Sequence, residues 1–268
     1  MQADEKDVFR PDKRVVYKAI GDIELKLHIF EPDAGTDDSP RPAIVFFHGG
    51  GWQRGHVANY YPRCRHMAER GMVAISAEYR IKDQHGNEPI DCLKDAKSAM
   101  RYVRGHSDEL GIDPDRIASG GSSAGGQLAF MVSRNDGIND PQDDLDISCA
   151  PNAVWLMAPV LNMGPDGFSH RWVRKYWEDF SPYHNITEAS PPCIIFLGEK
   201  DTITPPPVAR EFVTKMNSMD RRCELHIYPG AEHRFHRYQV ESLRENYYDI
   251  LEKADAFLVS LGLLEAKE

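Results

Sequence analysis

The sequence lacks any hydrophobic run that approaches the roughly 18 residues needed to cross a membrane. It also lacks the basic segment and apolar stretch that open a secretory signal peptide. A chain that begins Met1-Gln2-Ala3-Asp4 is equally compatible with a mature form from which a signal has been removed. We therefore expect a soluble protein without a membrane partner, either cytoplasmic or secreted.

Positive charge is in short supply as well. The chain has 32 lysines and arginines against 42 acidic residues, a formal net charge of −10, and no basic stripe. Such a surface repels the phosphate backbone of nucleic acids. A nucleic-acid partner is therefore not expected.

Cysteines are few, widely spaced and odd in number, and no C-x-x-C occurs, which argues against both a disulfide framework and a thiolate zinc site. We expect most of them to be small buried hydrophobes. His233 and His236 could suggest a metal, but H-E-x-x-H is absent and nothing nearby completes a ligand set. Phosphate-cradling motifs are missing too, so we expect neither a metal nor a cofactor. The cysteines are Cys64, Cys92, Cys149, Cys193 and Cys223.

No internal repeat, low-complexity tract or linker divides the 268 residues, and a single domain is expected. Strand-like and helix-like segments alternate along the chain, which predicts an α/β fold with a mostly parallel, doubly wound sheet of about eight strands. The first strand-like segment alternates polar and apolar residues and suits an outer antiparallel strand. The strands are expected at 23–30, 43–47, 73–77, 116–119, 153–158, 194–198 and 224–228, and the helices at 91–104, 124–133, 206–219 and 241–261.

Residues 164–190 do not fit this alternation. The segment follows a strand and is rich in aromatic residues, interspersed with charged ones. It is a candidate lid, although an amphipathic helix that buries its aromatic side chains against the core explains the same pattern.

Ser123 is the candidate nucleophile. It is the centre of a G-x-S-x-G motif within Gly121-Ser122-Ser123-Ala124-Gly125, between a short strand and a helix. A sharp turn there would hold the serine in a strained conformation with its hydroxyl exposed, and small neighbours would let the backbone pass closely. A glycine-rich loop that only packs strand on helix is the structural alternative.

A second glycine cluster, His48-Gly49-Gly50-Gly51-Trp52, follows the most hydrophobic strand. Acyl transfer builds negative charge on a carbonyl oxygen, and backbone N–H groups stabilise it best where no side chain blocks the approach. The amides of Gly50, Gly51 and Ala124 are therefore the predicted oxyanion donors.

A serine nucleophile needs a base and an orienting carboxylate. Where a G-x-S-x-G motif lies between a strand and a helix, the acid and then the histidine follow the serine along the chain. Two loops at the carboxyl ends of predicted strands supply them. Asp201 is the predicted acid, with Glu199 as its competitor. His233 is the predicted base, with His236 as its competitor.

With these motifs the chain resembles the esterases and lipases of the α/β-hydrolase fold that carry an H-G-G-G oxyanion motif, the relatives of hormone-sensitive lipase. Within that group it is similar to small bacterial acetyl and feruloyl esterases of carbohydrates. Besides the glycine clusters, the matching stretches include Ala77-Glu78-Tyr79-Arg80, 111–117, Ser181-Pro182-Tyr183 and Gly198-Glu199-Lys200-Asp201. The resemblance implies the triad Ser123, Asp201 and His233.

The expected function is a serine carboxylesterase for small-molecule esters, with acylated carbohydrates as candidate substrates and Trp52, Trp172 and Trp177 as candidate substrate contacts. Two features depart from the family pattern: Ser122 replaces the usual acidic residue or threonine before the nucleophile, and Arg234-Phe235-His236 replaces the usual glycine and phenylalanine after the histidine. An amidase or peptidase with the same triad, or an inactive ligand-binding relative, is the alternative.

Overall fold

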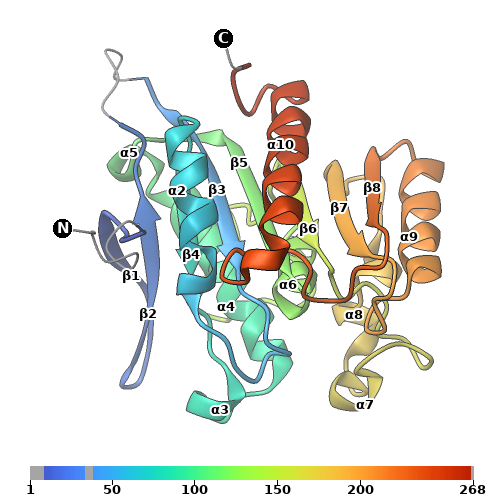
Figure 1. Cartoon of the computed structure of the whole chain (residues 1–268). Coiled ribbons are helices and arrows are strands. Elements are labelled where there is room, and N and C mark those ends of the chain that lie inside the picture. The colour runs from blue at the N-terminus through green and yellow to red at the C-terminus, as the bar shows by residue number, and fades with distance from the viewer. Residues whose placement is uncertain (1–8, 34–38, 267–268) are drawn as a thin grey trace.

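The computed structural model describes residues 9–33 and 39–266, where eight strands form one sheet in the order β1-β2-β4-β3-β5-β6-β7-β8 (Figure 1). Neighbouring strands are parallel except that β2 pairs antiparallel with both β1 and β4. The predicted mostly parallel sheet is thus confirmed, and each of the seven predicted strands is present. The strands are β1 (Lys13–Ile20), β2 (Ile23–Phe30), β3 (Arg41–Phe47), β4 (Val73–Ala77), β5 (Ile112–Ser122), β6 (Ala153–Met157), β7 (Cys193–Gly198) and β8 (Cys223–Tyr228).

The edge of the sheet at β1 differs from the prediction. Strand β2 is antiparallel, as expected, but it lies one place inside the edge, because β1 pairs along its whole length. Residues 23–30 thus form an outer antiparallel strand, as expected, but β1, which was not predicted, forms the edge. Strand β1 gives a weak sequence signal because the register shifts between Val16 and Lys18, which breaks the alternation of a regular strand.

Helices cover both faces of the sheet. In Figure 1, α2 and α10 stand in front of the strands, and α4 and α6 lie behind them. Helix α9 joins α6 on its face, where Phe212 and Phe130 meet edge to face at 5.1 Å. The predicted helices correspond to α4, α6, α9 and η3 with α10, whereas α2 was not predicted. The helices are η1 (Val57–Tyr60), α2 (Tyr61–Glu69), α3 (Lys82–His85), α4 (Pro89–Gly105), α5 (Ser107–Leu110), α6 (Ala124–Met131), α7 (His170–Val173), α8 (Trp177–Phe180), η2 (Pro182–Asn185), α9 (Pro206–Ser218), η3 (Glu241–Leu243) and α10 (Arg244–Ser260).

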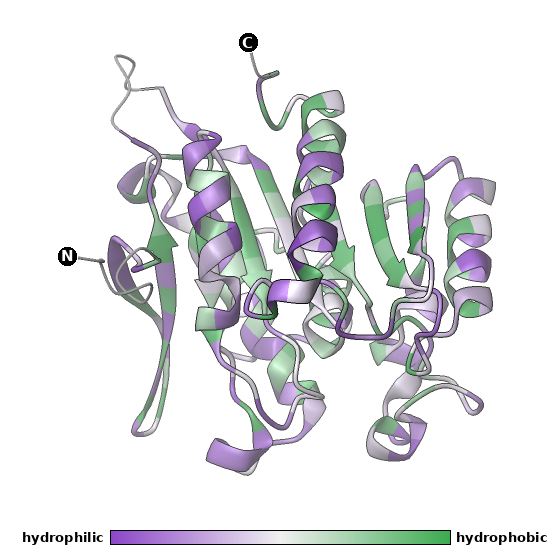
Figure 2. Ribbon diagram, in the orientation of Figure 1, coloured by the Kyte–Doolittle hydropathy of each residue, from purple (hydrophilic) through white to green (hydrophobic). Residues whose placement is uncertain are grey.

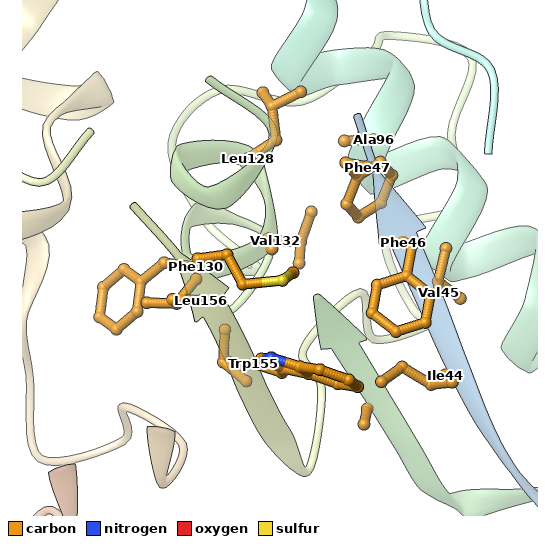
Figure 3. Packing of buried hydrophobic residues seen from close by; sticks show 14 of the residues in the cluster. Ile44, Val45, Phe46, Phe47, Ala96, Leu128, Phe130, Val132, Trp155 and Leu156 are labelled. Carbon is orange, nitrogen blue, oxygen red and sulfur yellow. The ribbon is translucent and has the colours of Figure 1, made fainter. Parts of the chain in front are cut away.

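The core lies on both faces of the central strands, which are continuously apolar, while the helices turn polar residues outward (Figure 2). Phe46 of β3 packs against Trp155 of β6 at 5.4 Å (Figure 3). It also packs against Tyr60 at 5.0 Å. Gly120 of β5 lies between Phe46 and Trp155, and a Cβ there would be 2.6 Å from the Phe46 ring. All five cysteines are buried free thiols, as expected.

Within residues 9–33 and 39–266, no helix combines the length and apolar character that crossing a bilayer requires.

A buried ion cluster, invisible in the sequence, joins β1 to α4 and to the segment after β4. The side chain of Asp95 is completely buried and accepts hydrogen bonds from the backbone N–H and the guanidinium of Arg80 at 2.7–3.0 Å. Lys18 Nζ lies 2.8 Å from the same carboxylate and 2.7 Å from Asp140. Removing one member of such a cluster leaves the others buried without compensation.

We therefore expect Asp95→Ala to lower the free energy of unfolding by about 3–5 kcal/mol. The control is Asp136→Ala, which removes an exposed carboxylate paired with Arg134 and should cost about 1 kcal/mol or less. Urea unfolding followed by circular dichroism measures both. An equal loss in the two variants would contradict the role assigned to Asp95.

Candidate active site

Ser123 lies at the sharp turn between β5 and α6. Its backbone is strained, with φ 54° and ψ −121°, values that a residue with a side chain rarely adopts. Its N–H lies 3.1 Å from the carbonyl oxygens of Met157 and Ala158, which fixes the turn to the end of β6. The side chain remains partly exposed. The sharp turn with a strained serine that the sequence predicts, called the elbow below, is therefore present.

The glycines around Ser123 are needed because the backbone segments touch. A Cβ on Gly125 would be 2.0 Å from the carbonyl oxygen of Phe47, at the end of β3. A Cβ on Gly121 would be 2.2 Å from the carbonyl oxygen of Gly125. These obstacles are backbone atoms, which cannot move aside as a flexible side chain could. The turn can therefore form only with hydrogen as the side chain at both positions.

His233 connects the serine to a carboxylate. Its Nε2 lies 2.9 Å from Ser123 Oγ, and its Nδ1 lies 2.8 Å from Asp201 Oδ2. An ionised carboxylate can only accept, so Nδ1 carries the proton and Nε2 is free to accept the serine hydroxyl. The other Asp201 oxygen accepts the N–H groups of Ile203 and Thr204, and the side chain is fully buried.

The two competitors occupy other places. Glu199 is exposed and accepts the N–H of Gly230. His236 is buried, its carbonyl accepts from Arg63, and burial lowers its pKa well below the ordinary value. The structure thus brings Asp201 and His233, and not Glu199 or His236, to Ser123. Among the residues described, no group of three or more His, Cys, Asp or Glu side chains could hold a metal ion.

The loop that contains the predicted oxyanion donors is held in place from behind. Tyr79 donates its hydroxyl to the carbonyl oxygen of His48 at 2.6 Å and stacks on the imidazole at 4.3 Å. Burial lowers the pKa of His48 to about 4, so this ring is a neutral structural part. In the described part of the chain, the N–H groups of Gly50 and Gly51 donate to no carbonyl or side chain. Ala124 is the first residue of α6, so its N–H has no acceptor within that helix.

The three tryptophans expected to contact substrate are not among the residues that line the cavity beside His233. Trp52 is 1% exposed, and its indole donates to Gln127 at 3.2 Å, so the prediction that it contacts substrate is wrong. Gln127 in turn donates to the carbonyl of Phe180. Trp52 therefore connects residues 48–52, called the oxyanion loop below, to residues 164–190. Trp172 and Trp177 are half-buried on that segment, and their contact with substrate stays a prediction.

Residues 164–190 form the short helices α7, α8 and η2 at the carboxyl end of the sheet (Figure 1). Phe180 is fully buried, and Trp172 packs edge to face on Trp52 at 6.4 Å. The aromatic residues of the segment thus pack partly against the core, as the second interpretation of the sequence proposed. Whether the segment moves as a lid stays a prediction.

A cavity of about 330 Å³ opens beside His233. One end is formed by Gly49, Gly50 and Ser122, next to the nucleophile. The other walls come from α2, the residues before it and the segment that follows His233. The candidate catalytic residues could be predicted from the sequence, but this cavity could not, because the residues that form its walls are distant in the chain.

Comparison with known proteins agrees with this architecture. The BD-FAE family matches residues 27–170, more than half of the chain, and the prolyl oligopeptidase family matches residues 155–256. The chain belongs to the BD-FAE family. This membership confirms the resemblance to α/β-hydrolase esterases and lipases.

Esterase 2 of Thermogutta terrifontis, phosphorylated by paraoxon, is 40% identical, covers 95% of this chain and 96% of its own, and superposes with a TM-score of 0.89. The propionate-bound form of that esterase is 39% identical, with coverage of 97% and 98% and a TM-score of 0.91. Esterase LipC of Mycobacterium tuberculosis is 28% identical over 73% of this chain and 53% of its own. The chain spans about half or less of the length of the curated relatives it matches. Its family is thus one of carboxylic ester hydrolases.

The close backbone contact at the elbow should make the protein sensitive to any side chain at Gly125. Gly125→Ala should lower the free energy of unfolding by at least about 1–3 kcal/mol, because the new methyl group overlaps the Phe47 carbonyl. Gly105→Ala is the matched control, since Gly105 is also helical and only the tip of Ile147 lies nearby, at 3.0 Å. There the better helix propensity of alanine should leave stability equal or higher. Thermal unfolding of the two variants checks this, and equal stability would show that the elbow tolerates a side chain.

Proposed function

We propose that the protein is a serine carboxylesterase that hydrolyses short-chain acyl esters through an acyl-enzyme. The observation that carries the proposal is the pair of contacts made by His233, at 2.9 Å to Ser123 and 2.8 Å to Asp201. Both distances lie within the range of hydrogen bonds that activate a nucleophile. The family of ester hydrolases to which the chain belongs supports the same chemistry.

In the first half-reaction, His233 Nε2 accepts the proton of Ser123 as Oγ attacks the ester carbonyl. Buried Asp201 keeps the imidazole in the required tautomer and stabilises the imidazolium. The imidazolium then gives the proton to the leaving alcohol. Water, activated by the same histidine, releases the acid from the acyl-enzyme.

The negative charge that develops on the carbonyl oxygen would be held by the N–H groups of Gly50, Gly51 and Ala124. All three are free of intramolecular acceptors in the described structure, so they lose no existing hydrogen bond when they bind the oxyanion. The tightly packed loop keeps them oriented before the reaction begins. Preorganised donors of this kind are worth roughly 10²–10³ in kcat each.

Nucleophilic attack is tested with Ser123→Ala. We expect kcat on p-nitrophenyl acetate to fall by several orders of magnitude, because without the triad only the roughly 10³–10⁴-fold acceleration from binding and the oxyanion hole remains. A fluorophosphonate probe should label the parent protein and Ser122→Ala, but not Ser123→Ala. Near-normal turnover by Ser123→Ala would contradict the mechanism. If the probe did not label the unmodified protein, an inactive binding protein would be favoured instead.

A short acyl group is the proposed substrate feature. A long chain would gain about 0.8 kcal/mol per buried methylene only in an apolar trough. Most residues that line the cavity beside His233 have polar or charged side chains, and residues 164–190 carry several exposed charged side chains. The propionate bound to the Thermogutta esterase is also a short carboxylate. Acetyl and feruloyl esters of carbohydrates are the natural substrates proposed from the family resemblance.

We accordingly expect kcat/KM to be highest for p-nitrophenyl acetate to butyrate and to fall for the octanoate and palmitate. Steady-state kinetics across the four esters measures the preference directly. A steady rise beyond the octanoate would mean that an apolar trough exists and that residues 164–190 cover it.

The match to the prolyl oligopeptidase family makes amide hydrolysis the second candidate. Both activities would use the same three residues. Alanyl p-nitroanilide compared with p-nitrophenyl acetate distinguishes them, because an esterase should process the anilide far more slowly. Comparable kcat/KM on the two substrates would favour the peptidase.

A further inference from the structure

The cavity beside His233 is lined by four arginines and by no acidic residue. Arg54 comes from just after the oxyanion loop, Arg63 from α2, and Arg234 and Arg237 from the segment after the histidine. The chain as a whole carries a net charge of −10, so this concentration of positive charge is local. Four cations that face one cavity repel each other unless an anion lies among them.

These arginines differ from others in the chain. Arg80 pairs with Asp95, Arg101 with Asp143 and Arg116 with Asp113, each at 2.7–2.8 Å. Within residues 9–33 and 39–266, none of the four cavity arginines forms an ion pair. The cavity is therefore a place where the fold leaves positive charge uncompensated.

Arg63 is the buried arginine of this cavity, and the surrounding residues fix its position. It is 2% exposed, one terminal nitrogen donates to the carbonyl of His236, and the guanidinium lies 4.5 Å above the Tyr247 ring. These contacts hold the group rigidly, yet its buried Nε has no acceptor among the described residues. A buried cation without a counter-ion is unfavourable, and an anion bound in the adjoining cavity would reduce that cost.

His236 adds a second unused polar atom. Its side chain is 9% exposed, and its buried Nδ1 also lacks a partner among the described residues. Burial and the nearby Arg63 keep this imidazole neutral, with its pKa well below the ordinary value. Burial also lowers the pKa of Arg237, and repulsion from Arg234 adds to this effect. The four arginines around the cavity thus favour a negative ligand.

We propose that this cavity binds a carboxylate carried by the ester substrate. The inference rests on the proposed function, because one end of the cavity, at Gly50 and His233, is where the ester would react. A substrate with its ester there could direct a carboxylate to the arginines, whose planar guanidinium groups match a carboxylate with two parallel hydrogen bonds. The volume of about 330 Å³ suits a small organic acid.

Matched substrates test the preference and locate the carboxylate. On the acyl side, mono-p-nitrophenyl glutarate is compared with its neutral carbamoyl analogue. On the leaving-group side, 4-carboxyphenyl acetate is compared with 4-carbamoylphenyl acetate. In one of these pairs we expect the anionic ester to have a kcat/KM about tenfold or more higher, mainly through a lower KM, with the ratio decreasing at high salt.

The double variant Arg234→Gln/Arg237→Gln should bring that ratio close to one. Both side chains are exposed at the cavity mouth, so the substitutions are mild, and Arg63→Gln tests the buried donor separately. Arg210→Gln is the matched control, because Arg210 is exposed on α9 outside the cavity and should leave the ratio unchanged. An unchanged ratio in the double variant and in Arg63→Gln would overturn the inference.

A binding measurement separates this inference from the esterase proposal. Calorimetric titration of the unmodified protein with glutarate and with neutral glutaramide requires no turnover. Tighter binding of glutarate, lost in the double variant, supports the anion site even if no ester is cleaved. Equal binding of the two, together with equal kcat/KM in both substrate pairs, overturns the anion site but leaves the esterase intact.

Discussion

The close contact between the turn at Ser123 and the end of β3 is the constraint on which the site depends. Because the Phe47 carbonyl lies where a Cβ of Gly125 would be, helix α6 can begin only this close to the sheet with glycine there. That proximity places Ser123 beside the oxyanion loop, which continues directly from β3. The strained serine conformation follows from the same fit, since its N–H is held by the carbonyls after β6.

Around this turn, hydrogen bonds hold the loops that carry the candidate catalytic residues. His48 and Tyr79 support the oxyanion loop, and Gln127 connects Trp52 to Phe180 beneath residues 164–190. Asp201 is fixed by two backbone N–H groups as well as by His233. Each of these contacts satisfies a buried polar group, so the second layer of the site also contributes to the stability of the fold.

Buried charges are paired in one part of the protein and unpaired in another. Away from the site, buried charges meet partners, as Asp95 does with Arg80 and Lys18. Beside His233, Arg63 is buried with an unused donor, and its neighbours in the cavity are also cations. Folding alone does not explain this second arrangement, because an unpaired buried charge is unfavourable. An anionic ligand in the cavity, as proposed above, would supply the missing negative charge.

The sequence alone predicted the mostly parallel sheet, most of its strands and the candidate catalytic residues, because continuous apolar runs, glycine clusters and chain order can be recognised in the sequence. It could not determine β1 as the edge strand, since a bulge breaks its alternation. It also misjudged Trp52, because aromatic residues at a pocket and in a core look alike until neighbours are known. Only the tertiary structure shows that Asp201, and not Glu199, contacts His233. Only the tertiary structure shows the buried ion cluster around Asp95 and the four arginines that line one cavity. The physical reason is that these features depend on distances between residues far apart in the chain, which no local pattern encodes.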